Sequence, residues 1–137
     1  MKAFLDTSAL FKKYVVEPGS ERLDELLKET EDIIIAPVTK IELFSALDRR
    51  LQEKSLKPSQ AKTIAQEITK DLPFFSAVLW NEALEEKAVG HVQTYHLRAL
   101  DALQLGAGQL SSCDLFITCD KTLARAAQKE LDQVLLL

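Results

Sequence analysis

Four acidic residues occupy positions in this sequence from which carboxylates can bind a metal ion together. Asp6 directly follows the apolar run Ala3–Leu5, and Asp120 lies two residues beyond a similar run, LFIT. Glu42 stands one helical turn after a third run, and Asp101 lies inside the apolar stretch LRALDALQLGAGQL. Clustered carboxylates repel one another unless a cation neutralises them, and oxygen ligands without His or Cys select Mg²⁺ or Mn²⁺. Such an ion suits the hydrolysis of phosphate esters.

Three of these acids also have a purely structural interpretation at the start of a helix. Asp6 and Asp120 each precede a helical pattern, where an Asp N-cap accepts hydrogen bonds from free backbone amides. Thr39 and Glu42 have the spacing of a capping box, in which the Glu side chain reaches back to the N-cap amide. Taken one at a time, each acid favours this structural interpretation, because capping residues are common.

Asp101 is harder to explain as a structural residue. On a helix its neighbours four positions away are Leu97 and Leu105, so its carboxylate lies in an apolar stripe. Burying a carboxylate there is costly unless the group is paired or bound to a metal. The one basic residue within three or four positions is Arg98, and a surface ion pair between Arg98 and Asp101 is the alternative.

Apolar runs and helical periodicities alternate along the chain, which predicts an α/β domain with a mainly parallel sheet covered on both faces. In such sheets ligands bind at the carboxyl ends of the strands, where Asp6, Glu42 and Asp120 would all lie. The predicted strands are Ala3–Leu5, Ile33–Ala36, Phe74–Leu79, Leu115–Thr118 and Val134–Leu137. Apolar stripes within residues 10–15 and 23–27 predict the first helices, and later helices are predicted at Thr39–Leu51, Ser59–Leu72, Trp80–Val92, Ala99–Leu110 and Lys121–Leu131.

The composition is that of an ordinary globular protein. The length of 137 residues predicts one domain, spanning residues 1–137, with 47% apolar and 28% charged residues. No apolar run approaches the roughly 20 residues of a membrane helix, and no secretory signal pattern follows Met1, so we expect a cytoplasmic protein that does not bind membranes. Cys113 and Cys119 bracket a predicted strand that holds them too far apart for a disulfide. The sequence contains no P-loop motif.

The charge balance bears on the class of substrate. The net charge of −4 comes from 21 acidic and 17 basic residues, which argues mildly against a broad basic face for nucleic acid. Without the four candidate acids, however, 17 acidic residues balance the 17 basic ones, so a metal-loaded domain need not repel a polyanion. The candidate contacts to a nucleic-acid backbone are Lys12, Lys13, Arg49, Arg50, Arg98, Lys121 and Arg125. For any one of them, a position on a solvated helix face is the simpler interpretation.

Four segments of the sequence together resemble a PIN domain, and its opening resembles most the toxin subunit of VapBC-type toxin–antitoxin pairs. The segments are DTSALFKKYV, IELFSAL, LRALDALQL and FITCDKTLARAA, and they contain the four acids in order. The resemblance covers essentially the whole chain. It implies a three-layer α/β/α sandwich with about five strands and a Mg²⁺- or Mn²⁺-dependent endoribonuclease. By matching position, it implies that the four acids bind the metal, that Thr118 supplies a supporting hydroxyl and that Ser8 is a further candidate for such a role.

The reaction expected of such a protein is the hydrolysis of an RNA phosphodiester by an activated water, with a 5′ phosphate on the product. The resemblance also implies a homodimer and an antitoxin that fills the acidic pocket. The helices Thr39–Leu51 and Ser59–Leu72 would then offer a groove for an antitoxin helix, whereas their simpler role is to cover the core. The alternative function is a catalytically silent PIN-like module that binds protein or RNA. A phosphatase would have a second Asp two residues after Asp6, where this sequence has Ser8.

Overall fold

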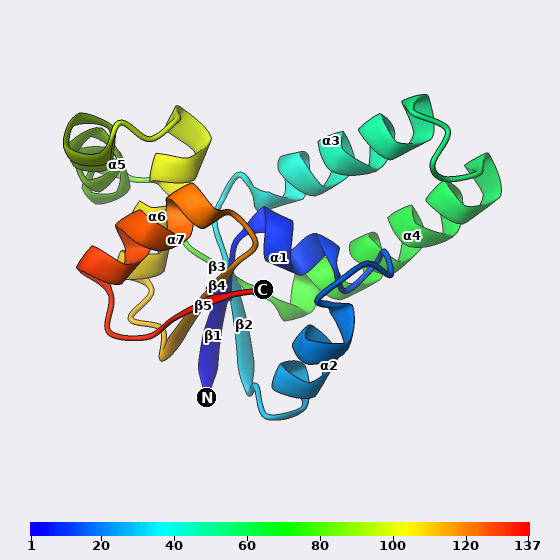
Figure 1. Ribbon diagram of the computed structural model, residues 1–137, viewed down its shortest axis with the longest axis horizontal. Coiled ribbons are helices and arrows are strands. Elements are labelled where there is room, and N and C mark those ends of the chain that lie inside the picture. Colours follow the sequence, from blue (N-terminus) through cyan, green and yellow to red (C-terminus); the bar gives the residue numbers. More distant parts are fainter.

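The structure is a computed structural model that describes all residues from 1 to 137, and a parallel sheet of five strands lies at its centre (Figure 1). The strands are β1 (Lys2–Leu5), β2 (Asp32–Ile35), β3 (Ser76–Ala77), β4 (Leu115–Thr118) and β5 (Val134–Leu136). Their order across the sheet is β3-β2-β1-β4-β5, and every neighbouring pair is parallel. β1 is therefore the central strand, with two strands on either side of it.

Helices cover both faces of this sheet, which confirms the predicted three-layer α/β/α arrangement. The helices are α1 (Thr7–Phe11), α2 (Ser20–Lys28), α3 (Thr39–Gln52), α4 (Pro58–Asp71), α5 (Glu82–Tyr95), α6 (Ala99–Leu110) and α7 (Lys121–Glu130). The first four lie on one side of the sheet and the last three on the other (Figure 1). α3 and α4 run side by side in opposite directions and extend away from the sheet.

Two apolar clusters fill the space between the sheet and the two helix layers. Successive residues of β1 point to opposite faces, so Ala3 and Leu5 join the cluster beneath α1–α4, whereas Phe4 joins the cluster beneath α5–α7. The rings of Phe4 and Phe116 stack with their centroids 5.1 Å apart. All four of these side chains are fully buried. The packing of these four side chains holds β1 and β4 together, next to the carboxyl ends of the two strands.

Two elements differ from the sequence-based expectation. The sequence predicts a buried strand over Phe74–Leu79, but β3 has two residues, both exposed, at the edge of the sheet. Leu72–Phe74 form a 3₁₀ turn just before this strand, which the fixed φ of Pro73 favours, so Phe74 lies outside the sheet. α1 is also shorter than its apolar stripe, because it ends at Phe11 and a turn follows, although Tyr14 and Val15 are buried.

No helix has the length and apolar character needed to cross a membrane.

The two cysteines are not joined by a disulfide, in agreement with the distance that the sequence predicts between them. Cys113 and Cys119 are both free thiols. Burial raises the pKa of each thiol above its usual value. Both are therefore poor nucleophiles at neutral pH.

Gly108 of α6 leaves room for the ring of Phe116, and we expect its substitution to destabilise the fold. A Cβ atom on Gly108 would lie 2.6 Å from Cδ2 and from Cε2 of Phe116. That ring is fully buried and cannot move without disturbing its stack on Phe4. Overpacking costs about 1–3 kcal/mol, which exceeds the roughly 1 kcal/mol that Ala gains over Gly in a helix. Gly108→Ala should therefore lower the midpoint of chemical denaturation.

The matched control for this prediction is Gly90→Ala in α5. No atom lies within 4 Å of the Cβ that this substitution adds. The higher helix propensity of Ala should then raise the denaturation midpoint. A raised midpoint for Gly108→Ala as well would contradict the close packing of α6 on β4.

Candidate active site

The candidate site lies where the chain order of the sheet reverses, between β1 and β4. The helix that follows β1 packs on one face of the sheet, and the helix that follows β4 packs on the other. Ligands of open parallel sheets bind in the crevice that this reversal leaves at the carboxyl ends of the strands. Asp6 follows β1, and Asp120 stands two residues after Thr118, the last residue of β4. The amide of Asp6 donates to the carbonyl of Ile117 at 3.1 Å, which joins the two strand ends.

Asp6 is almost fully buried and accepts three hydrogen bonds. Its Oδ1 accepts from Ser8 Oγ at 2.7 Å and from the amide of Ala9 at 2.9 Å, and its Oδ2 accepts from Thr118 Oγ1 at 2.6 Å. The bond from Ala9 makes Asp6 the N-cap of α1, as predicted. Burial outweighs these hydrogen bonds and raises the pKa of Asp6 to about 6. A cation bound beside Asp6 would therefore stabilise its ionised form.

The hydroxyls of Ser8 and Thr118 join Asp6 to the loop that carries Asp120. Thr118 Oγ1 donates to Asp6 and accepts from the amide of Asp120 at 3.0 Å. Ser8 Oγ donates to Asp6 and accepts from the amide of Cys119 at 3.0 Å. Each hydroxyl thus uses its single proton on the carboxylate and a lone pair on the loop. Both residues are placed to fix Asp6 relative to Asp120.

Asp120 is the N-cap of α7, as predicted. Its Oδ1 accepts a hydrogen bond from the amide of Leu123 at 2.9 Å. Its Oδ2 accepts no hydrogen bond from the protein. The capping role and a ligand role are therefore compatible, because each uses a different oxygen.

The prediction of a capping box for Glu42 is wrong. Val38 is the N-cap of α3 and Thr39 is already helical, so Glu42 has no N-cap amide to reach at the predicted position. Glu42 contacts α1 and α6 instead. Its Oε1 accepts from Thr7 Oγ1 at 3.0 Å and from Gln104 Nε2 at 2.7 Å. Its Oε2 accepts no hydrogen bond, and long-range contacts thus orient this carboxylate.

Asp101 lies in the first turn of α6, is partly buried and accepts no hydrogen bond. The alternative interpretation, an ion pair with Arg98, is wrong, because no such pair forms. Burial and the charges of Asp120 and Glu42 raise the pKa of Asp101, and the nearby charge of Arg98 opposes this only in part. The structure therefore brings Asp101 close enough to these two acids for their charges to act on it.

The four acids leave several carboxylate oxygens without a protein partner. These are Oε2 of Glu42, Oδ2 of Asp120 and both oxygens of Asp101. No three acidic, histidine or cysteine side chains are arranged to enclose a metal ion in this structure, so the four acids do not form a closed metal site. An open set of hard oxygen ligands fits Mg²⁺ or Mn²⁺, because Mg²⁺ usually keeps several water ligands.

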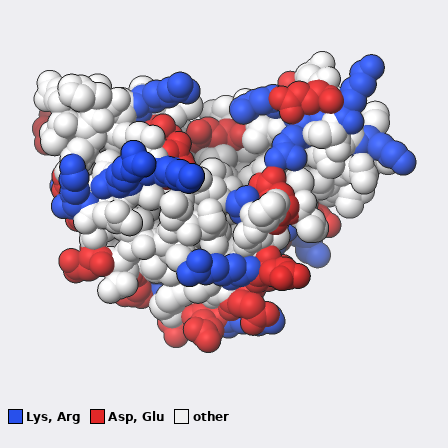
Figure 2. Space-filling model, in the orientation of Figure 1, with Lys and Arg blue, Asp and Glu red and all other residues white.

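A cleft of about 490 Å³ opens beside this cluster, between α1 and α3. Thr7, Ser8 and Glu42 line this cleft, and so do Arg49 and Arg50 of α3. Figure 2 shows acidic side chains in the notch between α3–α4 and α5–α7, with basic side chains on both sides of it. This arrangement of acids at the centre and bases at the rim suits a polyanion that meets a metal ion.

The family model for the PIN domain matches residues 3–129 of this sequence. The chain belongs to the PIN domain family. No curated protein matches this PIN domain closely enough to be informative.

Solved structures from several bacteria share the fold of this PIN domain. The FitAcB structure from Neisseria gonorrhoeae has a TM-score of 0.73 at 18% identity, over 98% of this chain and 96% of that one. A toxin–antitoxin complex from Klebsiella pneumoniae has a TM-score of 0.68 at 20% identity, over 89% and 90% of the two chains. VapBC-1 from nontypeable Haemophilus influenzae has a TM-score of 0.64 at 15% identity, over 99% and 98%. At these identities the likeness shows a common fold.

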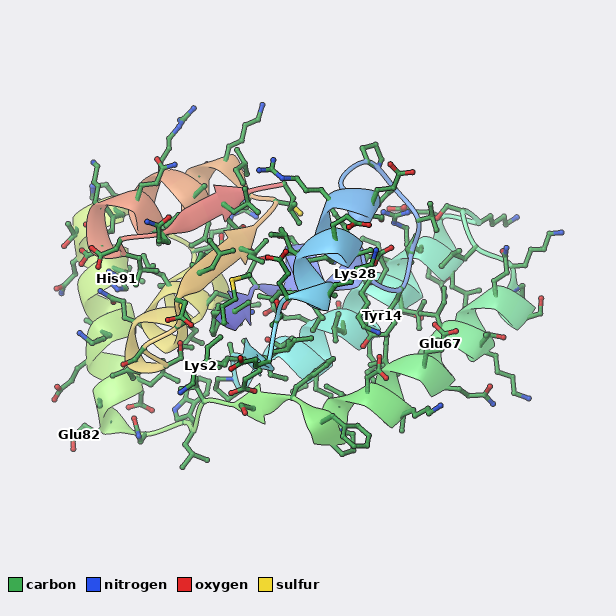
Figure 3. All side chains as sticks on the ribbon, turned by 90° about the horizontal axis from the view of Figure 1, so that it is seen from below. Lys2, Tyr14, Lys28, Glu67, Glu82 and His91 are labelled. Carbon is green, nitrogen blue, oxygen red and sulfur yellow. The ribbon has the colours of Figure 1, made fainter.

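Three of the basic residues predicted to contact a nucleic-acid backbone are held within the PIN domain by ion pairs. Arg50 Nη2 lies 2.6 Å from Glu17. Lys12 Nζ lies 3.2 Å from Glu17, and Lys13 Nζ lies 2.7 Å from Asp71 at the end of α4. Asp71 also accepts a hydrogen bond from Tyr14 Oη, and Figure 3 shows Tyr14 beside α4. These contacts anchor α4 to the segment after α1, so both lysines already have a structural role.

Other basic residues of the PIN domain have no acidic partner. Arg98 and Lys121 form no ion pair and stand at the beginning of α6 and α7, close in sequence to two of the four acids. Arg49 is also unpaired and lines the cleft. These three residues are the stronger candidates for contacts to a phosphate backbone.

Gln104 contacts the site directly, although the sequence does not predict it as a site residue. It lies three residues after Asp101 on α6, and its side chain reaches both Glu42 and Thr7. The available signal was a single polar residue in the apolar run ALQLGAG. Helical periodicity places this residue on the same face as Asp101. Its partners could not be predicted, because they come from distant segments.

Proposed function

We propose that this PIN domain is a Mg²⁺- or Mn²⁺-dependent endoribonuclease of the cytoplasm and the toxin of a toxin–antitoxin pair. The observation that carries the proposal is the set of four acids at the reversal of the sheet, three of which keep carboxylate oxygens that accept no hydrogen bond from the protein. Membership of the PIN family supports a nuclease. The toxin–antitoxin structures with the same fold support the assignment as a toxin.

The residues of the site would divide the work between binding the ion and binding the substrate. A bound ion would neutralise charge on the phosphate and make a water molecule more acidic. Asp6, fixed by three hydrogen bonds, and Asp101, which has no protein partner, would be ligands together with the free oxygens of Glu42 and Asp120. The unpaired basic residues at the rim would hold the phosphates on either side of the cleaved bond.

An antitoxin partner would have two features to recognise on this protein. A basic side chain placed against the four carboxylates would replace the metal and block the site. An apolar groove of about 300 Å³ between α3 and α4 would accept an amphipathic helix.

We further propose a homodimer, for which Trp80, Val89 and Val92 form an exposed apolar surface over a separate cleft beside α5 and α6.

The test of the proposed function is a cleavage assay with single-stranded RNA oligonucleotides and, in parallel, DNA of the same sequence. We expect cleavage of RNA in Mg²⁺ or Mn²⁺, products with a 5′ phosphate, and complete loss of activity in EDTA. Asp6→Asn should abolish cleavage as well. RNA cleavage that persists in EDTA would contradict the metal requirement. A protein that binds Mn²⁺ but cleaves no RNA would be the silent binding module instead.

A further inference from the structure

We propose that Gln104 is a positioning residue that orients Glu42 for metal binding, a role that rests on the proposed metal-dependent function. Gln104 comes from α6 and Glu42 from α3, so the two side chains meet from opposite helix layers. Gln104 Nε2 donates to Glu42 Oε1 at 2.7 Å. Gln104 is 2% exposed, and its hydrogen bond to the half-buried Glu42 is partly shielded from water.

The orientation of the Gln104 amide follows from its partners. An ionised carboxylate only accepts hydrogen bonds, so the Nε2 group must face Glu42. The same nitrogen lies 3.0 Å from Thr7 Oγ1 and 3.4 Å from Thr39 Oγ1. The amide oxygen then points away from these partners.

That oxygen is the one buried side-chain nitrogen or oxygen atom of the protein without a hydrogen-bond partner. An unpaired buried acceptor is unfavourable, and an apolar side chain of similar size would avoid it. The position of Gln104 is therefore poorly explained by stability alone. Its amide nitrogen serves the carboxylate of the site, which points to a functional role.

A neutral donor suits this position because it orients Glu42 without cancelling its charge. A Lys or Arg in the same place would neutralise the carboxylate and compete with a metal ion. Gln104 and Thr7 both bind Oε1 of Glu42, which leaves Oε2 free. Hydrogen-bond partners that orient metal ligands typically change metal affinity by about 10–100-fold when they are removed.

The experiment is a calorimetric titration of the purified full-length chain with Mn²⁺ in the absence of RNA. Gln104→Met keeps the length of the side chain but removes the donor, and Gln104→Asn keeps the amide but shortens its reach. Both variants should bind Mn²⁺ about 10–100-fold more weakly than the wild type. Thermal denaturation establishes that each variant is folded. If one of the two variants does not fold, the other still tests the role of Gln104.

The matched control is Gln109→Met on the same helix. The side-chain amide of Gln109 also forms hydrogen bonds, with His91 and Glu130. Figure 3 shows His91 on α5, far from Tyr14. Gln109→Met should bind Mn²⁺ like the wild type. A second control places Gln104→Met in a Glu42→Gln background, where the effect of Gln104 should disappear if it acts through Glu42.

The outcomes separate this inference from the proposed function. Wild-type Mn²⁺ affinity in Gln104→Met and Gln104→Asn would overturn the positioning role and leave the metal site intact. If Gln104→Met weakened Mn²⁺ binding by the same factor in the Glu42→Gln background, that result would also overturn the positioning role. A wild-type protein that binds no Mn²⁺ would overturn the metal-dependent function, and the positioning role with it.

Discussion

Asp101→Asn should reduce metal-dependent RNA cleavage by at least about 100-fold and leave the protein folded. Asp101 accepts no hydrogen bond from the protein, so its replacement removes no structural contact at the carboxylate. Burial and the charges of two other acids already raise its pKa, so loss of its charge should slightly stabilise the metal-free protein. Initial cleavage rates in Mn²⁺ and denaturation midpoints in EDTA measure the two effects separately.

The control for this prediction is Asp48→Asn on α3. Asp48 is exposed and forms no ion pair, so this variant should cleave RNA like the wild type. If Asp101→Asn cleaved RNA at the wild-type rate, Asp101 would not be part of the active site. A large fall in the denaturation midpoint of Asp101→Asn would instead identify Asp101 as a structural residue.

Asp6→Asn should stabilise the metal-free protein above pH 6, by up to about 3 kcal/mol. Burial raises the pKa of Asp6 from an ordinary 3.8 to about 6 in the folded protein. The unfolded chain therefore loses this proton at a lower pH than the folded chain does. The wild type should lose stability relative to the variant as the pH rises between these two values, and the difference should stay constant above them.

Denaturation of both proteins in EDTA at pH 4 and pH 7.5 measures this effect, because contributions from other groups cancel in the difference. The two free energies of unfolding should be similar near pH 4 and diverge by pH 7.5. Mn²⁺ at pH 7.5 should then stabilise the wild type and have little effect on Asp6→Asn, since binding favours the ionised carboxylate. A wild type that is the more stable protein at pH 7.5 in EDTA would contradict the account of Asp6.

The features predicted correctly from the sequence are those that depend on neighbouring residues. Asp6 and Asp120 cap helices because the amides they bind lie three residues ahead in the chain. The parallel sheet follows from continuous apolar runs between helical patterns. β3 is the exception, because a run of apolar residues after Pro73 does not show whether the chain lies at the edge of the sheet or in its centre.

The features that the sequence did not predict depend on contacts between distant segments. Glu42 accepts hydrogen bonds from Thr7, which is 35 residues away, and from Gln104, which is 62 residues away. A local capping-box pattern has no information about either partner. The environment of Asp101 was closer to the prediction, since its apolar neighbours in the sequence already implied that burial would be costly.

The central claim is that these four carboxylates form one divalent-metal centre. Anomalous diffraction from crystals grown with Mn²⁺ tests it most directly, because the map locates manganese without reference to activity. We predict a manganese peak in the crevice between β1 and β4, in contact with the carboxylates of Asp6, Glu42, Asp101 and Asp120 or with water that they hold. No peak at saturating Mn²⁺, or a peak away from these four residues, would contradict the account.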